Sequence, residues 1–534
     1  MNCRFERYDQ LDGDDRRLAD LLHSGSDERA MLGANGVNKY CGAPYPRTVV
    51  AFGSCTASTI SERGWFAARA AWQNLARQAA EDGVLGAADA AGRRIRRKLA
   101  HLMEVDDLPG LEVVLTPSGS DAESVALYLA SLRDERPLVN IVVGAREVGS
   151  GTVLAAGGRY FSECVPSGAK REPGAPLDAA LAERTSVVQV RIRNDLAAER
   201  SPDELDAEIQ DLVAGAVASG ARVIVHVVAH SKTGVHAPRL ETVNALVARY
   251  GERVVALIDA AQGRFSRRGL RDYLARGCMV IMTGSKFYGG PPFSGCLLVP
   301  HSVLPCGGKE MRFPAGFSDY LTPAQLPESW SAARASLNQT ANIGLLLRWA
   351  AAIAEIAAYY DAPGPSRYRV LRYFEAQTPI ILGRSPLLEL INVPIPVYDD
   401  MSERLLESKT TVFSFRVKAR SGRQLDQATL MCWVRWMNQD ISAAAAAETP
   451  DNIVLAARTC FQLGQAVHVG EQQSGEHDHV IRVAIGGELI TSVATDLALG
   501  ASLDQRLAWL ANKLEQLRMK IEFIAGHSAA LAAA

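Results

Sequence analysis

The feature that most constrains the fold is a regular alternation of apolar runs and amphipathic segments across residues 111–283. The apolar runs, such as RVIVHVVA at 222–229 and RVVALIDA at 253–260, are nearly continuous in Val, Ile and Leu. Strands that are apolar on both faces are typical of a parallel sheet covered by helices on both sides. The segments between them, such as 203–220, have helical periodicity. We therefore predict an α/β fold with a mainly parallel sheet and helices on both faces.

The pattern changes near residue 346, which divides the chain into three expected parts. Residues 1–61 form an N-terminal segment that we expect to be one wall of a ligand site, and residues 62–345 form a large α/β domain that begins with a helix over 62–104. Residues 346–534 begin with a long helix and continue with mixed strands and helices, which predicts a smaller α+β domain. Its last helix is expected over 502–526, followed by a mobile tail.

Composition excludes several classes of protein. The 534 residues are 48% hydrophobic and 22% charged, with a net charge of -2, which does not favour binding to nucleic acid or to a membrane surface. No uninterrupted apolar run approaches the roughly 18 residues that span a bilayer, and residues 1–20 lack the apolar core of a signal peptide. The nine cysteines lack CxxC spacing, which favours reduced thiols over disulfides or a metal site. We expect a cytoplasmic protein.

Lys286 is one of only ten lysines in the chain, and it stands between a buried apolar run ending at residue 282 and the loop Gly289–Pro292. Desolvation at the mouth of a buried strand lowers the pKa of a lysine and increases the share of free amine, which is the nucleophilic form. The alternative is a strand-end lysine whose stem covers apolar surface while its ammonium reaches water.

Three other stretches follow predicted strands and suit one ligand. TPSGSDAES at 116–124 opens a helix, and its amides and hydroxyls suit a phosphate, although Ser118 or Ser120 could simply cap the helix. Asp259 ends an apolar run, where its carboxylate could keep a pyridine nitrogen protonated or cap the next helix. Thr283 and Ser285 add two hydroxyls beside Lys286. Together these parts predict a site for pyridoxal 5'-phosphate (PLP).

ALIDAAQ at 256–262 and TGSKFYGGPPFSG at 283–295 resemble the class V aminotransferase superfamily of fold-type I PLP enzymes, which includes cysteine desulfurases, selenocysteine lyases and kynureninases. The resemblance implies that Lys286 forms the Schiff base and that Asp259 pairs with the pyridine nitrogen. It also implies cofactor contacts for a larger set of residues, namely Gly119, Ser120, Asp121, Gln262, Thr283 and Ser285.

The same resemblance implies a homodimer with shared active sites. The loop ASLNQTANIG at 335–344 lies where a neighbouring subunit often contacts the phosphate, which makes Thr340 a candidate. Ser231 stands where the superfamily usually has an asparagine. Val148 falls where a ring normally stacks on the cofactor, so either an aliphatic group packs there, or Glu147 takes part in proton transfer, or the register differs by one.

The C-terminal part is similar to the desulfurase segment that carries the sulfur-accepting cysteine. At that position the chain has Leu463, and Cys460 lies three residues earlier, which disfavours a persulfide-forming desulfurase unless Cys460 has taken over the role. Arg482, inside the apolar strand VIRVAI, is expected to bind the substrate carboxylate, or else to form an internal salt bridge. Arg458 is a second candidate for the carboxylate.

These residues predict a PLP-dependent enzyme that acts on a small-molecule amino-acid substrate through an external aldimine. A lyase that cleaves a C–S or C–C bond of the side chain is favoured, with an aminotransferase as the alternative. A noncatalytic regulator or scaffold that retains the fold is the alternative from another class. We expect no metal site, and His226, His230 and His236 are expected to be structural.

Overall fold

The computed structural model describes residues 7–305, 310–391, 393, 404–471 and 477–533. Its larger sheet has the strand order β2-β9-β8-β7-β5-β3-β4, with the short β6 beside β5. The strands from β8 to β4 run parallel, and β9 pairs antiparallel with both of its neighbours. This confirms the predicted mainly parallel sheet. The bounds are β2 (Glu112–Thr116), β3 (Leu138–Val143), β4 (Thr185–Val190), β5 (Arg222–Ala229), β6 (His236–Ala237), β7 (Val254–Ala260), β8 (Met279–Thr283) and β9 (Gly295–Val299).

The near-continuous apolar strands are explained by two separate cores, one on each face of this sheet. Along β5, Val223 and Val225 enter one core, whereas Ile224 between them enters the other. The same alternation occurs on β8, where Val280 and Ile281 point to opposite faces. A strand with both faces buried needs apolar residues at every position, which removes the alternating polar pattern of a half-exposed strand.

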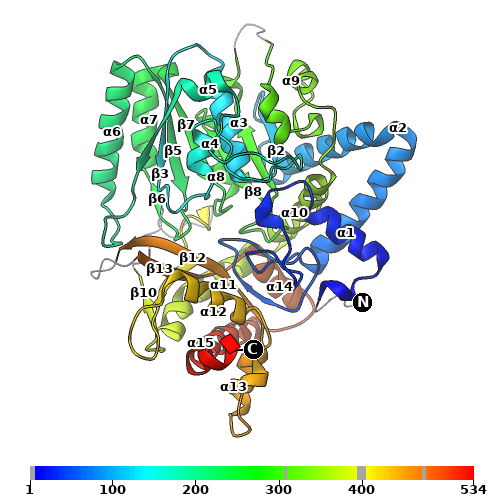
Figure 1. The fold of residues 1–534 in the computed structure, drawn as a ribbon, viewed down its shortest axis with the longest axis vertical. Coiled ribbons are helices and arrows are strands. Elements are labelled where there is room, and N and C mark those ends of the chain that lie inside the picture. The colour runs from blue at the N-terminus through cyan, green and yellow to red at the C-terminus, as the bar shows by residue number, and fades with distance from the viewer. Residues whose placement is uncertain (1–6, 306–309, 392, 394–403, 472–476, 534) are drawn as a thin grey trace.

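Helices supply the other side of each core. The helix α3 (Gly119–Ser131), which follows β2, covers one face. The opposite face is covered by α6 (Pro202–Ala218), α7 (Leu240–Tyr250) and α8 (Arg267–Ala275), as Figure 1 shows for the upper half of the molecule. The short helices α4 (Thr152–Ala156), α5 (Ala179–Glu183) and α9 (Ser331–Ser336) lie in connecting segments.

A second, smaller sheet has the order β1-β12-β13-β11-β10, and Figure 1 shows it below the larger one. Four of its strands come from the C-terminal part: β10 (Leu388–Leu390), β11 (Val412–Val417), β12 (Phe461–Glu471) and β13 (His477–Ala484). The fifth, β1 (Val50–Phe52), belongs to the N-terminal segment and pairs parallel with β12. Residues 1–61 are therefore tied to the smaller sheet, which the sequence did not indicate.

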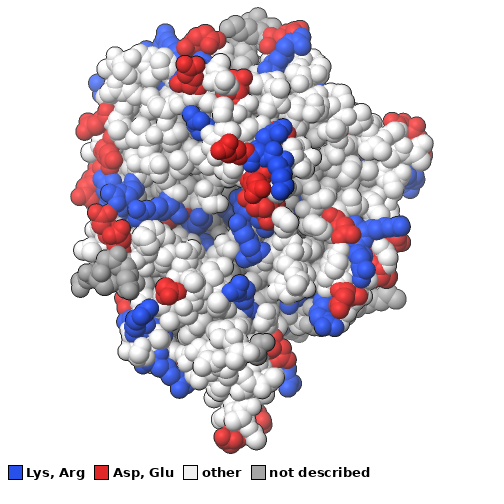
Figure 2. Space-filling view, in the orientation of Figure 1, with Lys and Arg blue, Asp and Glu red and all other residues white. Residues whose placement is uncertain are grey.

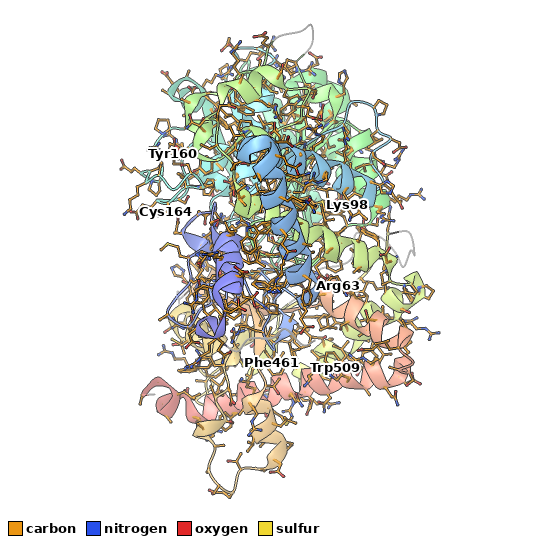
Figure 3. All side chains as sticks on the ribbon, turned by 90° about the vertical axis from the view of Figure 1, so that its right-hand side faces the viewer. Arg63, Lys98, Tyr160, Cys164, Phe461 and Trp509 are labelled. Atoms are coloured by element: carbon orange, nitrogen blue, oxygen red, sulfur yellow. The ribbon has the colours of Figure 1, made fainter. Side chains whose placement is uncertain are left out.

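The helices around the smaller sheet are α11 (Gly364–Leu382), α12 (Gln427–Met437), α13 (Asp451–Arg458), α14 (Gly487–Ala498) and α15 (Leu503–Ala533). In Figure 3 α15 carries Trp509 along the lower edge of the molecule. The helix α15 continues to Ala533, so the predicted end of the last helix at residue 526 was wrong.

Two long helices connect the halves. The helix α2 (Glu62–Leu102) bends at Gly83, where φ is 75°, and it packs along α10 (Ile343–Asp361). Arg63 and Lys98 mark the two ends of α2 in Figure 3, and Arg63 forms a 2.9 Å ion pair with Glu355 of α10. By length and composition α10 could cross a membrane, with a mean hydropathy of 1.3, but 67% of that stretch is buried inside the protein, as in a core helix.

Candidate active site

A cavity of about 230 Å³ lies where the carboxyl ends of β5, β7 and β8 meet the smaller sheet and the N-terminal segment. In parallel sheets ligands bind beyond these strand ends. Figure 2 shows Lys and Arg side chains gathered near the middle of one face, between the two halves. The predicted residues that line the cavity are Gly119, Ser120, Asp259, Thr283, Ser285, Lys286 and Arg482.

The loop around Lys286 is shaped by glycines. The amide of Gly284 donates to the carbonyl of Ser294, and the amide of Gly290 donates to the carbonyl of Gly284, each at 2.9 Å. A Cβ at either glycine would lie 2.6 Å from the Cβ of Ala352 on α10. The Gly/Pro-rich loop therefore folds tightly against α10 and leaves the Lys286 side chain directed into the cavity.

The Lys286 amine is chemically suited to nucleophilic attack. Burial lowers the pKa of Lys286 to about 8, and the nearby Asp259 carboxylate limits the fall. Among the described residues, no hydrogen bond or ion pair engages its Nζ atom. A larger share of the amine is therefore unprotonated near neutral pH than for an exposed lysine.

Asp259 lies at the end of β7, beside β8. Its Oδ1 atom accepts a 3.1 Å hydrogen bond from the amide of Ala261, and the side chain lines the cavity. Gln262 does not line the cavity. Its Nε2 atom donates to the carbonyl of Cys55 at 3.1 Å, and its Oε1 atom is buried without a hydrogen-bond partner in the described part of the chain.

The opposite end of the cavity is formed by the N-terminus of α3. Ser118 caps this helix and lines the cavity with Gly119 and Ser120. Asp121 does not line the cavity. It accepts a 2.5 Å hydrogen bond from the Ser118 hydroxyl, and burial raises the pKa of Asp121 to about 7. The helix amides and the hydroxyls make this end suitable for an anion.

Arg29 adds a cation to this end of the cavity, which the sequence analysis missed. Its Nη2 atom lies 3.2 Å from the Ser118 Oγ, and its guanidinium pairs with Asp27. Burial opposes the charge on Arg29, but Asp27 outweighs this cost and raises the pKa of the guanidinium. No local pattern in the sequence separates Arg29 from other arginines, because it reaches the cavity only through the tertiary fold.

The turn after β3 presents neither of the two residues expected there. Val148 is buried in the apolar core, and Glu147 lies in a buried network outside the cavity. Gly149, next in the chain, lines the cavity instead, and the aromatic rings on the wall come from Tyr40 and Phe293.

Glu147 is the acceptor at the centre of that network. One carboxylate oxygen accepts from Arg193 Nε at 2.6 Å, and the other accepts from the Ser231 hydroxyl at 2.7 Å and from the Thr233 hydroxyl. Ser231 therefore shapes the turn between β5 and β6 and does not itself line the cavity. Both carboxylate oxygens of Glu147 are thus used to hold the turn, and Glu147 does not line the cavity.

Arg482 of β13 lines the cavity, and all five of its N–H groups have protein acceptors. Its Nε and Nη2 atoms donate to the carbonyl of Gln465 at 3.1 and 3.0 Å, and Nη2 also donates to the Thr56 hydroxyl at 2.6 Å. Its Nη1 atom donates to the carbonyls of Cys55 at 3.3 Å and Lys232 at 3.1 Å. The expected alternative of an internal salt bridge is not present among the described residues, because every acceptor of the Arg482 guanidinium is a carbonyl or a hydroxyl.

Further residues that the sequence pointed to also lie outside the cavity. Arg458 is exposed at the C-terminal end of α13, the helix that Figure 1 labels near the bottom of the molecule. Cys460 follows it and is also remote from the lining, and Thr340 is exposed on the loop before α10. In contrast Cys55, which the sequence analysis did not single out, brings a thiol to the cavity wall.

The three histidines near β5 are buried or half-buried and do not line the cavity. Burial lowers the pKa of His230 to about 3 and that of His236 to about 4. Burial also opposes protonation of His226, but the Glu123 carboxylate at 3.0 Å outweighs it and raises the pKa of His226. Among the described residues, no group of three or more His, Cys, Asp or Glu side chains could hold a metal ion.

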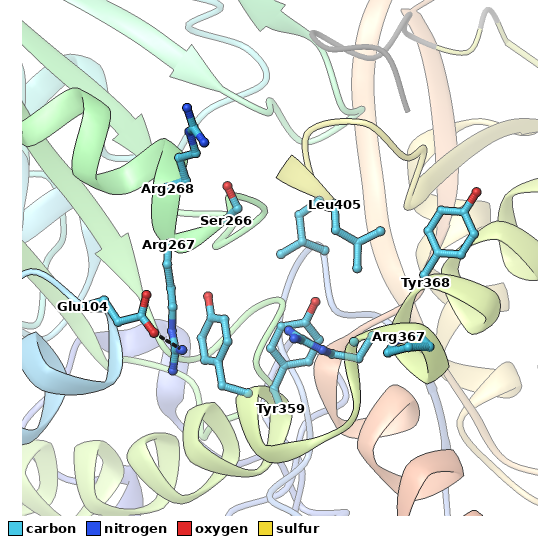
Figure 4. Close-up of a pocket in the computed structure, with 12 residues that line it drawn as sticks. Glu104, Ser266, Arg267, Arg268, Tyr359, Arg367, Tyr368 and Leu405 are labelled. Carbon is cyan, nitrogen blue, oxygen red and sulfur yellow. Dashed lines mark hydrogen bonds and ion pairs between the residues drawn. The ribbon is translucent and has the colours of Figure 1, made fainter. Parts of the chain in front are cut away.

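A larger cavity of about 850 Å³ lies between α8, α10 and α11 and is drawn in Figure 4. Its arginines are already engaged, because Arg267 pairs with Glu104 at 2.5 Å and lies 3.7 Å from the ring centre of Tyr360, and Arg367 stacks on Tyr359. None of the predicted site residues lines it. The smaller cavity is therefore the candidate active site.

No protein-family model matches the sequence, and no curated protein matches it. Solved structures are similar in fold. A point mutant of C-DES with glycine covalently linked to the PLP cofactor is 12% identical, with a TM-score of 0.50 over 88% of this chain and 96% of its own. The complex between the cystine C-S lyase C-DES and its reaction product cysteine persulfide is 13% identical, with a TM-score of 0.49 over 87% and 97%.

The cysteine desulfurase CsdA from Escherichia coli is 17% identical, with a TM-score of 0.45 over 85% of this chain and 95% of its own. At these identities the similarity concerns the fold. The chain therefore has the architecture of the fold-type I PLP enzymes, the group that the motifs around Lys286 and Asp259 predicted.

Proposed function

We propose that the chain is a PLP-dependent enzyme that acts on an amino acid. The observation that carries the proposal is the joint position of Lys286 and Asp259, at the ends of the neighbouring strands β8 and β7, in one cavity with the anion-binding end of α3. Gly149 keeps this cavity open, because a Cβ there would lie 2.8 Å from Thr152 Oγ1 and 3.0 Å from Ser120 Oγ. The residues present thus fit the cofactor.

The expected contacts follow from the chemistry of each group. Lys286 would bind the aldehyde, and Asp259 would keep the pyridine nitrogen protonated. The phosphate would lie at the start of α3, near the residues Arg29, Ser118, Gly119, Ser120, Thr283 and Ser285. When bound, PLP supplies a ring that accepts electrons from the substrate.

Lys286 would act twice. Its amine would hold the aldehyde of the cofactor, and the same amine, when free, would be placed to remove the proton from the substrate α-carbon. Burial, which lowers the pKa of Lys286 to about 8, favours the unprotonated form that both roles require. The same amine can return a proton to the substrate or the leaving group, so one side chain serves as base and acid.

For the reaction itself we favour a lyase that cleaves a C–S or C–C bond in the side chain. The resemblance of the C-terminal part to the desulfurase segment supports this choice, and C-DES, which shares the fold, is described as a cystine C-S lyase. An aminotransferase remains the alternative reaction. We further propose a cytoplasmic homodimer in which Thr340, exposed and outside its own cavity, reaches the cavity of the second copy.

The test is the absorbance spectrum of the purified protein with added PLP, alone and with each of the twenty common amino acids. We expect a yellow band that one or a few amino acids perturb. Return of the band with release of ammonia and a keto acid, or of another cleavage product, supports the lyase, whereas stable bleaching to pyridoxamine phosphate identifies an aminotransferase. A band that no amino acid perturbs would favour the noncatalytic alternative, and no band at all contradicts the proposal.

Gly149→Ala is expected to weaken PLP binding by about tenfold or more, because a methyl group enters the space beside Ser120. The measurement is the dissociation constant for PLP from the absorbance titration. Gly215→Ala on α6, where a Cβ meets nothing within 4 Å, is the matched control and should bind PLP as the unchanged protein does. Equal affinity for both variants would show that the cofactor does not occupy this space.

A further inference from the structure

A second lysine, Lys232, enters the same cavity as Lys286. It follows Ser231 in the turn between β5 and β6, and its side chain lines the cavity. In the described part of the chain no hydrogen bond or ion pair engages its ammonium group, although its backbone is fully bonded. A half-buried cation without a partner is costly unless a ligand supplies the counter-charge.

The backbone of Lys232 is held from both sides. Its amide donates to the carbonyl of Glu147 at 2.8 Å, and its carbonyl accepts from Arg482 Nη1 at 3.1 Å. On either side of it, the hydroxyls of Ser231 and Thr233 bond to the Glu147 carboxylate. The turn therefore fixes the direction of the Lys232 side chain before any ligand binds, which reduces the entropy lost on binding.

Arg482, the residue expected to bind the substrate carboxylate, has no free donor. Its five N–H groups bond to carbonyls and to one hydroxyl, and one of those carbonyls belongs to Lys232. A carboxylate could bind Arg482 directly only by displacing these acceptors. Lys232 lies next to it and has three donors available.

We propose that the ammonium of Lys232 binds the α-carboxylate of the substrate, and that Arg482 positions Lys232 and adds its charge without donating to the substrate. This assignment rests on the proposed function. It predicts that the enzyme discriminates an amino acid from its α-amide through Lys232.

The charged groups around Lys232 give the binding a pH dependence. Burial, with the positive charges of Arg482, Lys286 and Arg29, lowers the pKa of Lys232 to about 7, and Glu147 partly opposes this fall. Below that pH the free enzyme carries the ammonium, and as pH rises through it the ammonium is lost. Affinity for a carboxylate should therefore fall above about pH 7.

The experiment measures the affinity of the PLP-loaded protein for its ligands from changes in the absorbance band. The ligands are L-alanine and L-aspartate, the α-amide of each, and L-asparagine. In Lys232→Met we expect the affinity for both amino acids to fall about 10- to 100-fold, as for loss of a charge-assisted hydrogen bond, and the preference over the amides to disappear. In Lys232→Arg we expect the preference to remain and its decline above pH 7 to be absent, because a guanidinium stays charged.

Lys98→Met is the control for loss of a lysine charge. Lys98 is exposed on α2 and lies outside the cavity, so its charge is screened by water and we expect less than about a threefold change. A second readout does not use the reaction: acetic anhydride should acetylate Lys232, and L-alanine but not L-alaninamide should protect it, as measured by peptide mass spectrometry.

Two results would overturn the assignment: an unchanged preference for the carboxylate in Lys232→Met, or loss of discrimination only between L-aspartate and L-asparagine. The second would place Lys232 against the substrate side chain. Lys232→Met should retain the yellow band even when it binds amino acids weakly. If the proposed function itself is wrong, the unchanged protein has no band, so the two failures can be distinguished.

Discussion

Lys286→Ala is expected to abolish the yellow absorbance of bound PLP and to lower the turnover of the amino acid by at least about 10²- to 10⁴-fold, the usual range for loss of a general base. The loss should be larger than for any other residue of the cavity, because the same amine holds the cofactor and moves the proton. The measurement combines the spectrum with the rate of product formation at saturating PLP.

The variant Lys286→Arg tests whether the positive charge of Lys286 or its nucleophilic amine is required. It preserves the cation beside Asp259, yet a guanidinium stays protonated at every accessible pH and cannot attack an aldehyde. We expect it to be as inactive as Lys286→Ala, with a normal thermal unfolding midpoint for both proteins. Retention of the band and of turnover in either variant would assign the chemistry to another amine, and Lys232 would be the first to examine.

Glu147→Ala is expected to lower the free energy of unfolding by about 3–5 kcal/mol, the range for removing one partner of a buried ion pair. Arg193 and Glu147 have side chains that are 4% and 2% exposed, so the substitution leaves a buried guanidinium without its closest counter-charge. It also leaves the hydroxyls of Ser231 and Thr233 without their shared acceptor. Urea denaturation of the unchanged protein and the variant measures the effect.

Glu199→Ala is the control for that prediction. Glu199 also contacts Arg193, at 3.3 Å, but its side chain is 26% exposed. Ion pairs with partial access to water contribute about 0–1 kcal/mol, so this variant should lose little stability. Similar losses for the two variants would contradict the view that the Glu147 network, and not general charge around Arg193, holds the turn that carries Lys232.

The fold could be predicted because its signal is local. The central strands β5, β7 and β8 of the larger sheet are buried on both faces, so the sequence shows short apolar runs there, and α2 and α10 are long helices with clear boundaries. The position of β1 could not be predicted. Its pairing with β12 joins Val50 to Phe461, and a three-residue strand carries no sequence signal that identifies so distant a partner.

The residues of the site also fall into some that could be predicted from the sequence and some that could not. Lys286 and Asp259 follow predicted strands of one parallel sheet, so their meeting in one cavity follows from topology. Arg29 and Cys55 belong to the N-terminal segment, and they could not be predicted because the position of that segment depends on long-range packing. The sequence also could not show that Lys232, and not its neighbour Ser231, faces the cavity. The Ser231 hydroxyl bonds instead to Glu147, which lies 84 positions earlier in the chain.

The most direct test of the central claim is to treat the PLP-loaded protein with sodium borohydride, digest it, and locate the pyridoxyl group by mass spectrometry. Reduction converts the lysine adduct into a stable secondary amine, so the cofactor marks the lysine that held it. The account predicts a single labelled peptide carrying the group on Lys286. Label on Lys232, or no labelled peptide at all, would contradict it.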